Sequence, residues 1–247
     1  MQTEHAALRP GQTRRETVFF DLDDTLYDRA VPYLAAFRQF FGSRYAEKAA
    51  QAFDAVIRRG YEVFRPAHTG QITMEQMHIY RHQTGLRDVG IEITPAQALE
   101  MQALYAAQQG RICLSKTMET VLDLCCARFA GVGVITNGGV QSQTKKLQSL
   151  GIARWVRPEM IFISDAVGVM KPAPEIFRMA GHAAGGPCIY VGDSYSQDIA
   201  SAAACGWTTI WLDRRGDTPG TPPPDHTAAS EEVLLQCLEA LSRQSDV

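Results

Sequence analysis

Acidic residues stand at two places in the sequence where their spacing allows chemistry. Asp21 and Asp23 lie two residues apart at the end of an apolar run, and Asp193 and Asp198 follow a second such run. Asp21, Asp23 and Asp193 form an oxygen-rich set that suits Mg²⁺, which takes one or two carboxylates together with phosphate oxygens of a substrate. A carboxylate can also attack phosphorus to give an aspartyl-phosphate, while a second carboxylate protonates the leaving oxygen and later deprotonates water. These residues therefore predict a magnesium site for phosphoryl chemistry.

Other polar groups in the sequence are suited to bind the phosphoryl oxygens. They are the Thr136 hydroxyl, the backbone N–H groups of Asn137 and Gly138, and the Lys171 ammonium. Crowded carboxylates raise one another's pKa, so the metal and the lysine are needed to keep a carboxylate nucleophile ionised. The alternative, that these residues only form turns and helix caps, is disfavoured because they recur at the ends of separate predicted strands.

The elements that would position these groups alternate between strands and helices. Continuous apolar runs predict strands buried on both faces, and a helical pattern follows each of the later runs. This alternation predicts a doubly wound α/β fold with a mostly parallel, Rossmann-like sheet, whose ligands bind beyond the carboxyl ends of the strands. The predicted strands are 17–21, 131–136, 160–163, 188–192 and 207–212, and the predicted helices are 117–129, 140–150, 173–184 and 196–205.

A helical insert is predicted at 29–111, between the first strand and the rest of the α/β pattern. Its helices are expected at 30–42, 46–64, 74–84 and 95–109, separated by breakers at Gly70, Gly85 to Gly90 and Pro95. The predicted domains are then an α/β core at 17–28 and 112–247, the helical cap at 29–111 and a flexible N-terminal extension at 1–16. A Pro/Gly-rich loop is expected at 214–227, and Ser230 is expected to begin a last helix that reaches about residue 242.

Composition limits the classes of partner and the compartment. The 247 residues include 24 Lys and Arg against 27 Asp and Glu, which gives a net charge of −3. That balance gives no global electrostatic reason to bind a nucleic acid polymer or an anionic membrane, and no run of about 18 apolar residues is present to span one. The six cysteines lack CxxC spacing, so we expect reduced, buried thiols and a cytoplasmic protein.

Four ordered motifs carry a family resemblance. DLDDT (21–25), ITNG (135–138), KP (171–172) and GDSYSQD (192–198) resemble the four motifs of the haloacid dehalogenase-like hydrolase superfamily, and the match covers roughly 17–212. The resemblance implies that Asp21 is the nucleophile and Asp23 the general acid and base. It also implies that Mg²⁺ is held by the Asp21 carboxylate, the Asp23 backbone carbonyl and Asp193.

The same resemblance assigns supporting roles to other motif residues. Thr136 and Lys171 would bind the phosphate, and Asp198 would orient Lys171 or metal-bound water. Thr25 is expected to brace the first motif through its hydroxyl. Members of the dehalogenase branch lack the second aspartate of the first motif, because halide leaves without a proton. The presence of Asp23 therefore favours phosphoryl transfer from an oxygen leaving group over dehalogenation.

The insert is similar to the helical cap of the subfamily, called C1, that contains phosphoglycolate phosphatases and β-phosphoglucomutases. Two segments, ITNGGVQSQTKKLQSLGI and SDAVGVMKP, resemble bacterial pyrimidine 5′-nucleotidases of that group. We therefore expect a Mg²⁺-dependent phosphatase for a small phosphate monoester, with a nucleoside 5′-monophosphate as first candidate and a sugar or glycolate-type phosphate as second. A phosphomutase and a catalytically silent phosphometabolite-binding protein stay open as alternatives. The sequence does not indicate the oligomeric state.

Overall fold

The computed structural model describes residues 15–244, so most of the predicted N-terminal extension (1–14 of it) lies outside the described residues. The chain divides into two compact units. The first contains the described residues up to Leu26, Ser115–Asn137 and the chain from Ala153 onward. The second contains Tyr27–Leu114 and Gly138–Ile152.

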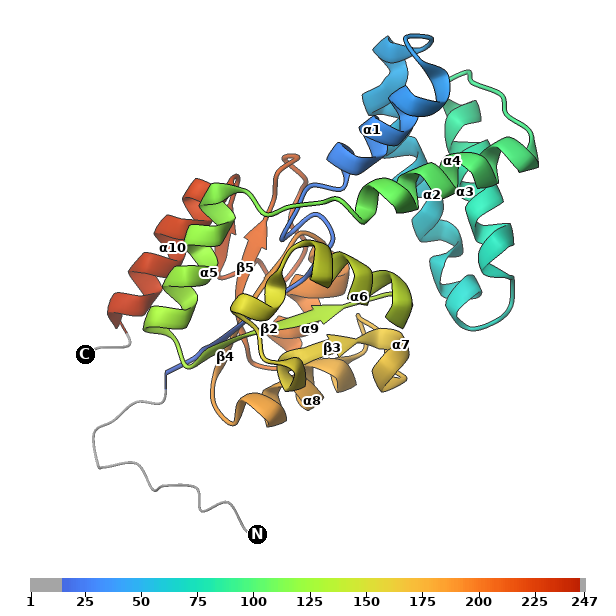
Figure 1. Cartoon of the computed structure of the whole chain (residues 1–247). Helices are drawn as coiled ribbons and strands as arrows, with labels where there is room; N and C mark the ends of the chain where they lie inside the picture. Colours follow the sequence, from blue (N-terminus) through green and yellow to red (C-terminus); the bar gives the residue numbers. More distant parts are fainter. Residues whose placement is uncertain (1–14, 245–247) are drawn as a thin grey trace, which may run out of the picture. The chain divides into compact units, whose positions relative to one another are not determined.

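A parallel sheet forms the centre of the first unit (Figure 1). Its six strands have the order β3-β2-β1-β4-β5-β6, and every pair of neighbours is parallel. The carboxyl ends of all strands therefore lie along one edge, as the sequence predicts. The strands are β1 (Thr17–Phe20), β2 (Gly131–Thr136), β3 (Ile161–Ile163), β4 (Cys188–Gly192), β5 (Thr208–Leu212) and β6 (His226–Ala228).

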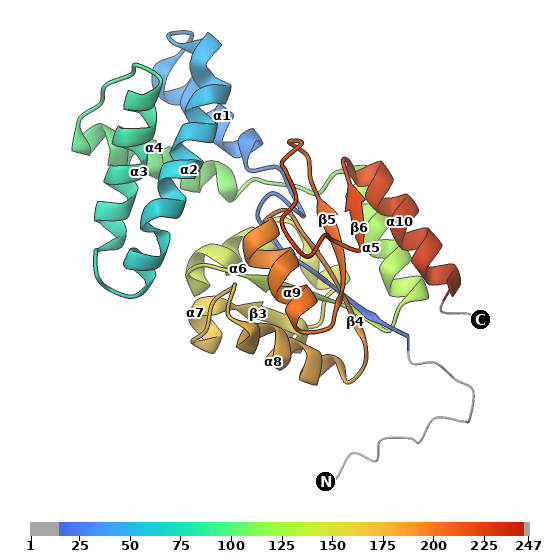
Figure 2. The ribbon, with the colours of Figure 1, turned by 180° about the vertical axis from the view of Figure 1, so that it is seen from behind.

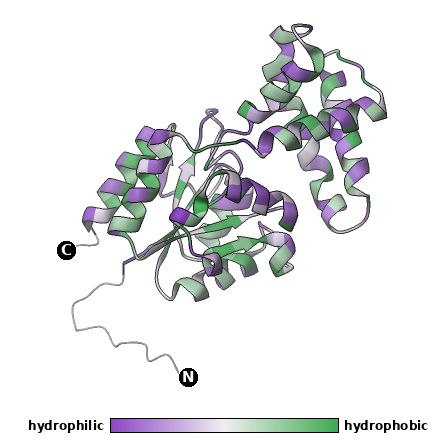
Figure 3. Cartoon of the chain, in the orientation of Figure 1, coloured by the Kyte–Doolittle hydropathy of each residue, from purple (hydrophilic) through white to green (hydrophobic). Residues whose placement is uncertain are grey.

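Helices cover both faces of this sheet. The helices α5 (Lys116–Arg128) and α10 (Glu231–Gln244) lie side by side on one face, whereas α8 (Pro174–Ala184) and α9 (Ala200–Ala204) lie on the other (Figures 1 and 2). Every residue of β1 and β4 is buried for this reason. The strands β2 and β3 are mostly hydrophobic, while the helices alternate between hydrophobic and hydrophilic residues (Figure 3).

The second unit is helical. Its helices are α1 (Ala30–Phe41), α2 (Ala49–His68), α3 (Met74–Asp88), α4 (Pro95–Gln109) and α6 (Val140–Ser149). Thr73 and Thr94 each cap a helix start through a reciprocal pair with the glutamine three residues later. The core of this unit contains Tyr33, Phe37, Phe53, Leu86 and Met101, among other buried apolar residues.

Gly85 was predicted to break a helix, and that prediction is wrong. The helix α3 continues through Gly85 to Asp88. A Cβ at Gly85 would come within 2.7 Å of the Val56 backbone, so the glycine lets α2 and α3 pack closely. Glycine is a helix breaker by local propensity, but the close contact with α2 accounts for the glycine at this position.

Three further expectations need correction. The predicted loop at 214–227 ends in the strand β6, whose His226 pairs with Ile210 of β5. This strand has only three residues and contains no apolar run, so the sequence does not indicate it. The predicted helix 196–205 is a π-helical turn, Tyr195–Ile199, followed by α9. All six cysteines are free, but the expectation that they are buried holds for Cys125 and Cys188 alone, since Cys205 and Cys237 are half-buried and Cys113 and Cys126 are exposed. Within residues 15–244, no helix combines the length and apolar character that a membrane crossing requires.

Candidate active site

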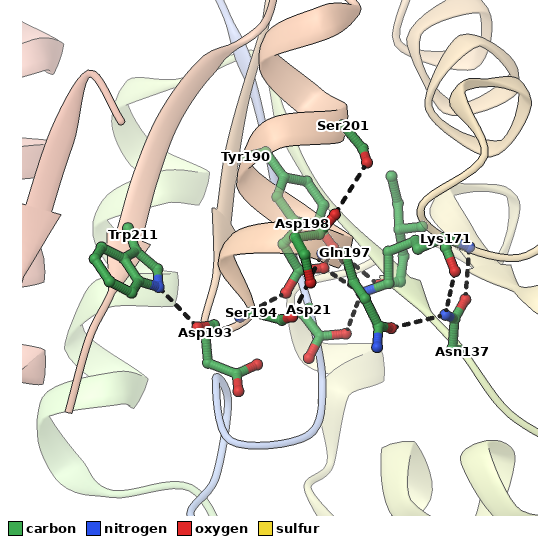
Figure 4. Close-up of polar contacts among 12 residues, drawn as sticks. Asp21, Asn137, Lys171, Tyr190, Asp193, Ser194, Gln197, Asp198, Ser201 and Trp211 are labelled. Carbon is green, nitrogen blue, oxygen red and sulfur yellow. Dashed lines mark hydrogen bonds and ion pairs between the residues drawn. The ribbon is translucent and has the colours of Figure 1, made fainter. Parts of the chain in front are cut away.

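A buried lysine joins two of the predicted motifs at the carboxyl edge of the sheet. Asp21 directly follows β1, and Asp198 lies in the π-helical turn after β4. The Nζ of Lys171 lies 2.6 Å from Oδ1 of Asp21 and 2.6 Å from Oδ1 of Asp198 (Figure 4). All three side chains are less than a tenth exposed. The structure thus brings together three residues that the sequence places 150 and 27 positions apart.

Burial and neighbouring charges set the protonation of this cluster. Burial raises the pKa of Asp21 to about 7, against the lowering effect of Lys171, and the Asp198 and Asp23 charges raise it further. Burial opposes the charge of Lys171, but Asp198 and Asp21 together hold the pKa of the lysine well above its ordinary value. The lysine is therefore a cation at any physiological pH, placed against the carboxyl group to which the motif resemblance gives the role of nucleophile.

The Asn137 side chain holds the backbone of Lys171 in place. Its Nδ2 donates to the Lys171 carbonyl at 2.8 Å, and its Oδ1 accepts from the Lys171 N–H at 2.9 Å. Nδ2 also lies 3.2 Å from Oε1 of Gln197 (Figure 4). The sequence predicts a phosphate-binding role for the Asn137 backbone N–H only, and no signal in it indicates this contribution of the side chain.

An acidic cluster at the same edge could hold a divalent cation. Asp21, Asp193 and Asp198 each offer a carboxylate oxygen, and these three atoms lie within 4.8 Å of one another. Both oxygens of Asp198 already accept hydrogen bonds, from Lys171 and from the Ser194 N–H. Hard carboxylate oxygens such as these three fit Mg²⁺.

The remaining predicted residues are distributed as follows. Thr136 is the last residue of β2 and is buried, and Asp23 is half-buried two residues beyond Asp21. Gly138 adopts φ 145°, a conformation that favours glycine, and it falls in the second compact unit. The prediction that the Thr25 hydroxyl braces the first motif is wrong, because this buried hydroxyl has no hydrogen-bond partner in the described part of the chain.

Two arginines after β5 support the first motif instead. Arg214 donates to the Thr25 carbonyl at 3.3 Å, and Arg215 forms an ion pair with Asp24 at 3.2 Å. The Asp213 side chain organises this loop by accepting three backbone N–H groups, from residues 215, 216 and 217. Asp24 has a left-handed φ of 63°, so an ion pair at its side chain helps to fix an uncommon backbone conformation. No motif in the sequence marks these arginines.

Gly192 offers a test of how closely Asp198 must be placed. A Cβ at Gly192 would lie 2.6 Å from the Asp198 carboxylate, so Gly192→Ala must displace that side chain and with it Lys171. We expect kcat to fall by about tenfold or more, with a stability loss of about 1–3 kcal/mol from overpacking. Gly131→Ala is the matched control, because its Cβ would meet nothing closer than 4.0 Å. Steady-state kinetics and thermal unfolding of both variants measure the difference, and wild-type kcat in Gly192→Ala would contradict it.

The comparisons with known proteins agree with this architecture. The family model for haloacid dehalogenase-like hydrolases matches residues 16–206. The match spans more than half of the chain and includes all four motifs. The chain therefore belongs to the haloacid dehalogenase-like hydrolase family, and it is an enzyme of the hydrolase class.

Curated relatives of similar length are named as phosphatases. The glyceraldehyde 3-phosphate phosphatase of Methanopyrus kandleri is 28% identical, over 92% of this chain and 99% of that protein. The pyrimidine 5′-nucleotidase YjjG of Escherichia coli is 26% identical, over 90% of this chain and 96% of that protein. The phosphoserine phosphatase of Thermus thermophilus is 30% identical, but the match covers only 57% of this chain and 58% of that protein.

Solved structures share the fold. The HAD-hydrolase YfnB of Bacillus subtilis, described as bound to magnesium, gives a TM-score of 0.67 at 22% identity, covering 92% of this chain and 99% of that one. The L-2-haloacid dehalogenase of Xanthobacter autotrophicus also gives 0.67, at 14% identity, with 92% and 99% covered. At these identities the likeness establishes the fold alone, since the same fold serves both phosphatases and dehalogenases.

Proposed function

We propose that this enzyme is a Mg²⁺-dependent phosphatase that hydrolyses a small phosphate monoester through an aspartyl-phosphate at Asp21. The observation that carries the proposal is the buried Lys171 ammonium, held at 2.6 Å from both Asp21 and Asp198. A fixed cation beside a carboxylate nucleophile is suited to an anionic substrate group. The names of the full-length relatives, a sugar-phosphate phosphatase and a nucleotidase, support the same substrate class.

The proposed reaction has two steps that the chain's own residues perform. A carboxylate oxygen of Asp21 bonds to phosphorus as the ester oxygen leaves, and Asp23 donates a proton to that oxygen. Asp23 then removes a proton from water, whose oxygen attacks phosphorus and releases Asp21 and inorganic phosphate. Lys171, the Thr136 hydroxyl and the N–H groups of residues 137 and 138 neutralise the phosphoryl oxygens. Bound Mg²⁺, held by Asp21, Asp193 and the Asp23 carbonyl, would supply further charge neutralisation.

Metal dependence should be visible directly. EDTA should abolish hydrolysis of p-nitrophenyl phosphate, and excess Mg²⁺ should restore it. Asp193→Asn should raise the Mg²⁺ concentration for half-maximal activity by about tenfold or more, because it removes a charged ligand. Asp217→Asn, an exposed aspartate in the loop after β5, is the matched control and should leave that concentration unchanged. Full activity of metal-free protein in EDTA would contradict the assignment.

Asp23 favours one of the reaction classes that this fold supports. A halide leaves without a proton, whereas an alkoxide needs one, so a carboxylic acid at this position has a use only with an oxygen leaving group. We therefore favour phosphoryl transfer over the dehalogenation that the structural relatives of that name perform. A phosphomutase would return an isomeric phosphate in place of free phosphate, so product analysis distinguishes it. A silent binding protein would show no turnover.

The helical insert at 29–111 is proposed to be the cap that sets substrate choice, with a nucleoside 5′-monophosphate preferred and a sugar or glycolate-type phosphate second. The pyrimidine nucleotidase among the relatives supports the first choice. A cytoplasmic location is also proposed, because all six cysteines are free thiols, which suits a reducing compartment.

A further inference from the structure

We propose that Tyr190 is a positioning residue for Lys171, an inference that rests on the proposed phosphatase function. Tyr190 lies in the middle of β4 and is fully buried. Its hydroxyl oxygen lies 3.0 Å from Nζ of Lys171 and 3.2 Å from Oδ1 of Asp198 (Figure 4). The tyrosine belongs to none of the four motifs.

The hydroxyl completes the set of acceptors around the ammonium. A lysine ammonium has three protons to donate, and here three oxygens receive them, from Asp21, Asp198 and Tyr190. The single tyrosine proton can in turn point to Asp198 or to the Ile135 carbonyl, each at 3.2 Å. Each polar group of this buried network therefore has a partner.

A neutral third acceptor is what this site requires. Asp198 and Tyr190 together fix two of the ammonium protons, so the third is directed at Asp21, where the phosphoryl group would form. A third carboxylate in place of the hydroxyl would bury another negative charge beside Asp21 and Asp198, which costs free energy. The hydroxyl orients Lys171 without adding charge. Within residues 15–244, the Tyr190 hydroxyl has hydrogen-bond partners in Lys171, Asp198 and Ile135 and none in Asp21, so we infer that it acts through the lysine.

The surrounding packing allows the hydroxyl to be removed alone. The Tyr190 ring contacts Phe177 edge to face, with centroids 5.2 Å apart, and Trp207 at 6.3 Å. Tyr190→Phe keeps these ring contacts and deletes only the oxygen. We expect kcat for p-nitrophenyl phosphate to fall by about 10- to 100-fold, as for loss of a hydrogen bond to a charged group, while KM changes by less than about threefold.

The test compares single and double variants with matched controls. Tyr33→Phe is the control for loss of a buried tyrosine hydroxyl, because Tyr33 is fully buried in the helical unit and its hydroxyl has no hydrogen-bond partner among residues 15–244. It should leave kcat unchanged. In a Lys171→Met background, Tyr190→Phe should lower the residual rate no further, since its effect is exerted through the ammonium.

The outcomes separate this inference from the proposed function. A wild-type enzyme that releases no phosphate from any monoester refutes the proposed function itself. An active wild type with an equally active Tyr190→Phe refutes only the positioning role. An additive loss in the Lys171→Met background also refutes it, because a structural effect would not depend on the lysine. If Tyr190→Phe does not fold, Tyr190→Met repeats the measurement with a flexible apolar side chain.

Discussion

Asp21→Asn is expected to reduce turnover by on the order of 10⁶-fold, as removal of a catalytic nucleophile does. The amide cannot form the acyl-phosphate bond, and Lys171 at 2.6 Å would face a neutral group in place of a carboxylate. Acid-quench labelling with a radioactive monoester should therefore detect phosphoryl-enzyme in the wild type and none in the variant. Labelling of Asp21→Asn at wild-type stoichiometry would place the nucleophile elsewhere.

The same variant should remain folded. Its free energy of unfolding, compared with that of the wild type at two pH values, tests this expectation. Burial raises the pKa of Asp21 to about 7 from 3.8, so the folded state favours the protonated acid. That contribution to stability is present below pH 4 and is lost as the pH rises through 7. Metal-free Asp21→Asn should therefore be at least as stable as the wild type at pH 8, and the difference should shrink towards pH 4. Urea unfolding at both pH values measures it.

Asp23→Asn is expected to fail differently, because this residue acts in both steps. General acid or base help is typically worth about 10²–10⁴-fold a step. p-Nitrophenolate leaves without a proton, so the variant should still be phosphorylated by p-nitrophenyl phosphate and then hydrolyse the intermediate slowly. Stopped-flow absorbance should show a burst of about one nitrophenolate per active site before a slow steady rate.

An alkyl phosphate provides the internal control for Asp23. Its alkoxide needs protonation, so both steps should be slow in Asp23→Asn and no burst should form. A steady rate equal to that of the wild type with p-nitrophenyl phosphate would remove Asp23 from the acid and base role. A burst in Asp21→Asn would exchange the roles assigned to the two aspartates.

The residues at the carboxyl edge of the sheet can be predicted from the sequence, because the apolar runs and the polar residues that follow them are local signals that agree with one another. β1 and β4 are buried on both faces, so they appear as uninterrupted apolar runs, and the residues just beyond them are polar. The parallel topology then requires Asp21 and Asp198 to meet at one edge. Lys171 lies near Asp21 and Asp198 for the same topological reason, because the segment that precedes α8 also lies at the carboxyl edge of the sheet.

What the sequence could not predict depends on tertiary contacts. Tyr190 is an apolar-looking strand residue until its hydroxyl is placed beside Lys171. Gly85 resembles a helix breaker until its contact with Val56 is known. Arg215 lies 191 positions from its partner Asp24, and no pattern links the two. The substrate depends on side chains that no motif specifies.

Release of inorganic phosphate from a panel of monoesters is the most direct measure of the proposed phosphatase activity. The panel contains nucleoside 5′-monophosphates, sugar phosphates and phosphoglycolate, each assayed with Mg²⁺ and with EDTA, and 2-chloropropionate is assayed for halide. We expect Mg²⁺-dependent phosphate release from at least one monoester, abolished in Asp21→Asn, and no halide. Halide release without phosphate release from any member of the panel would contradict the proposed activity.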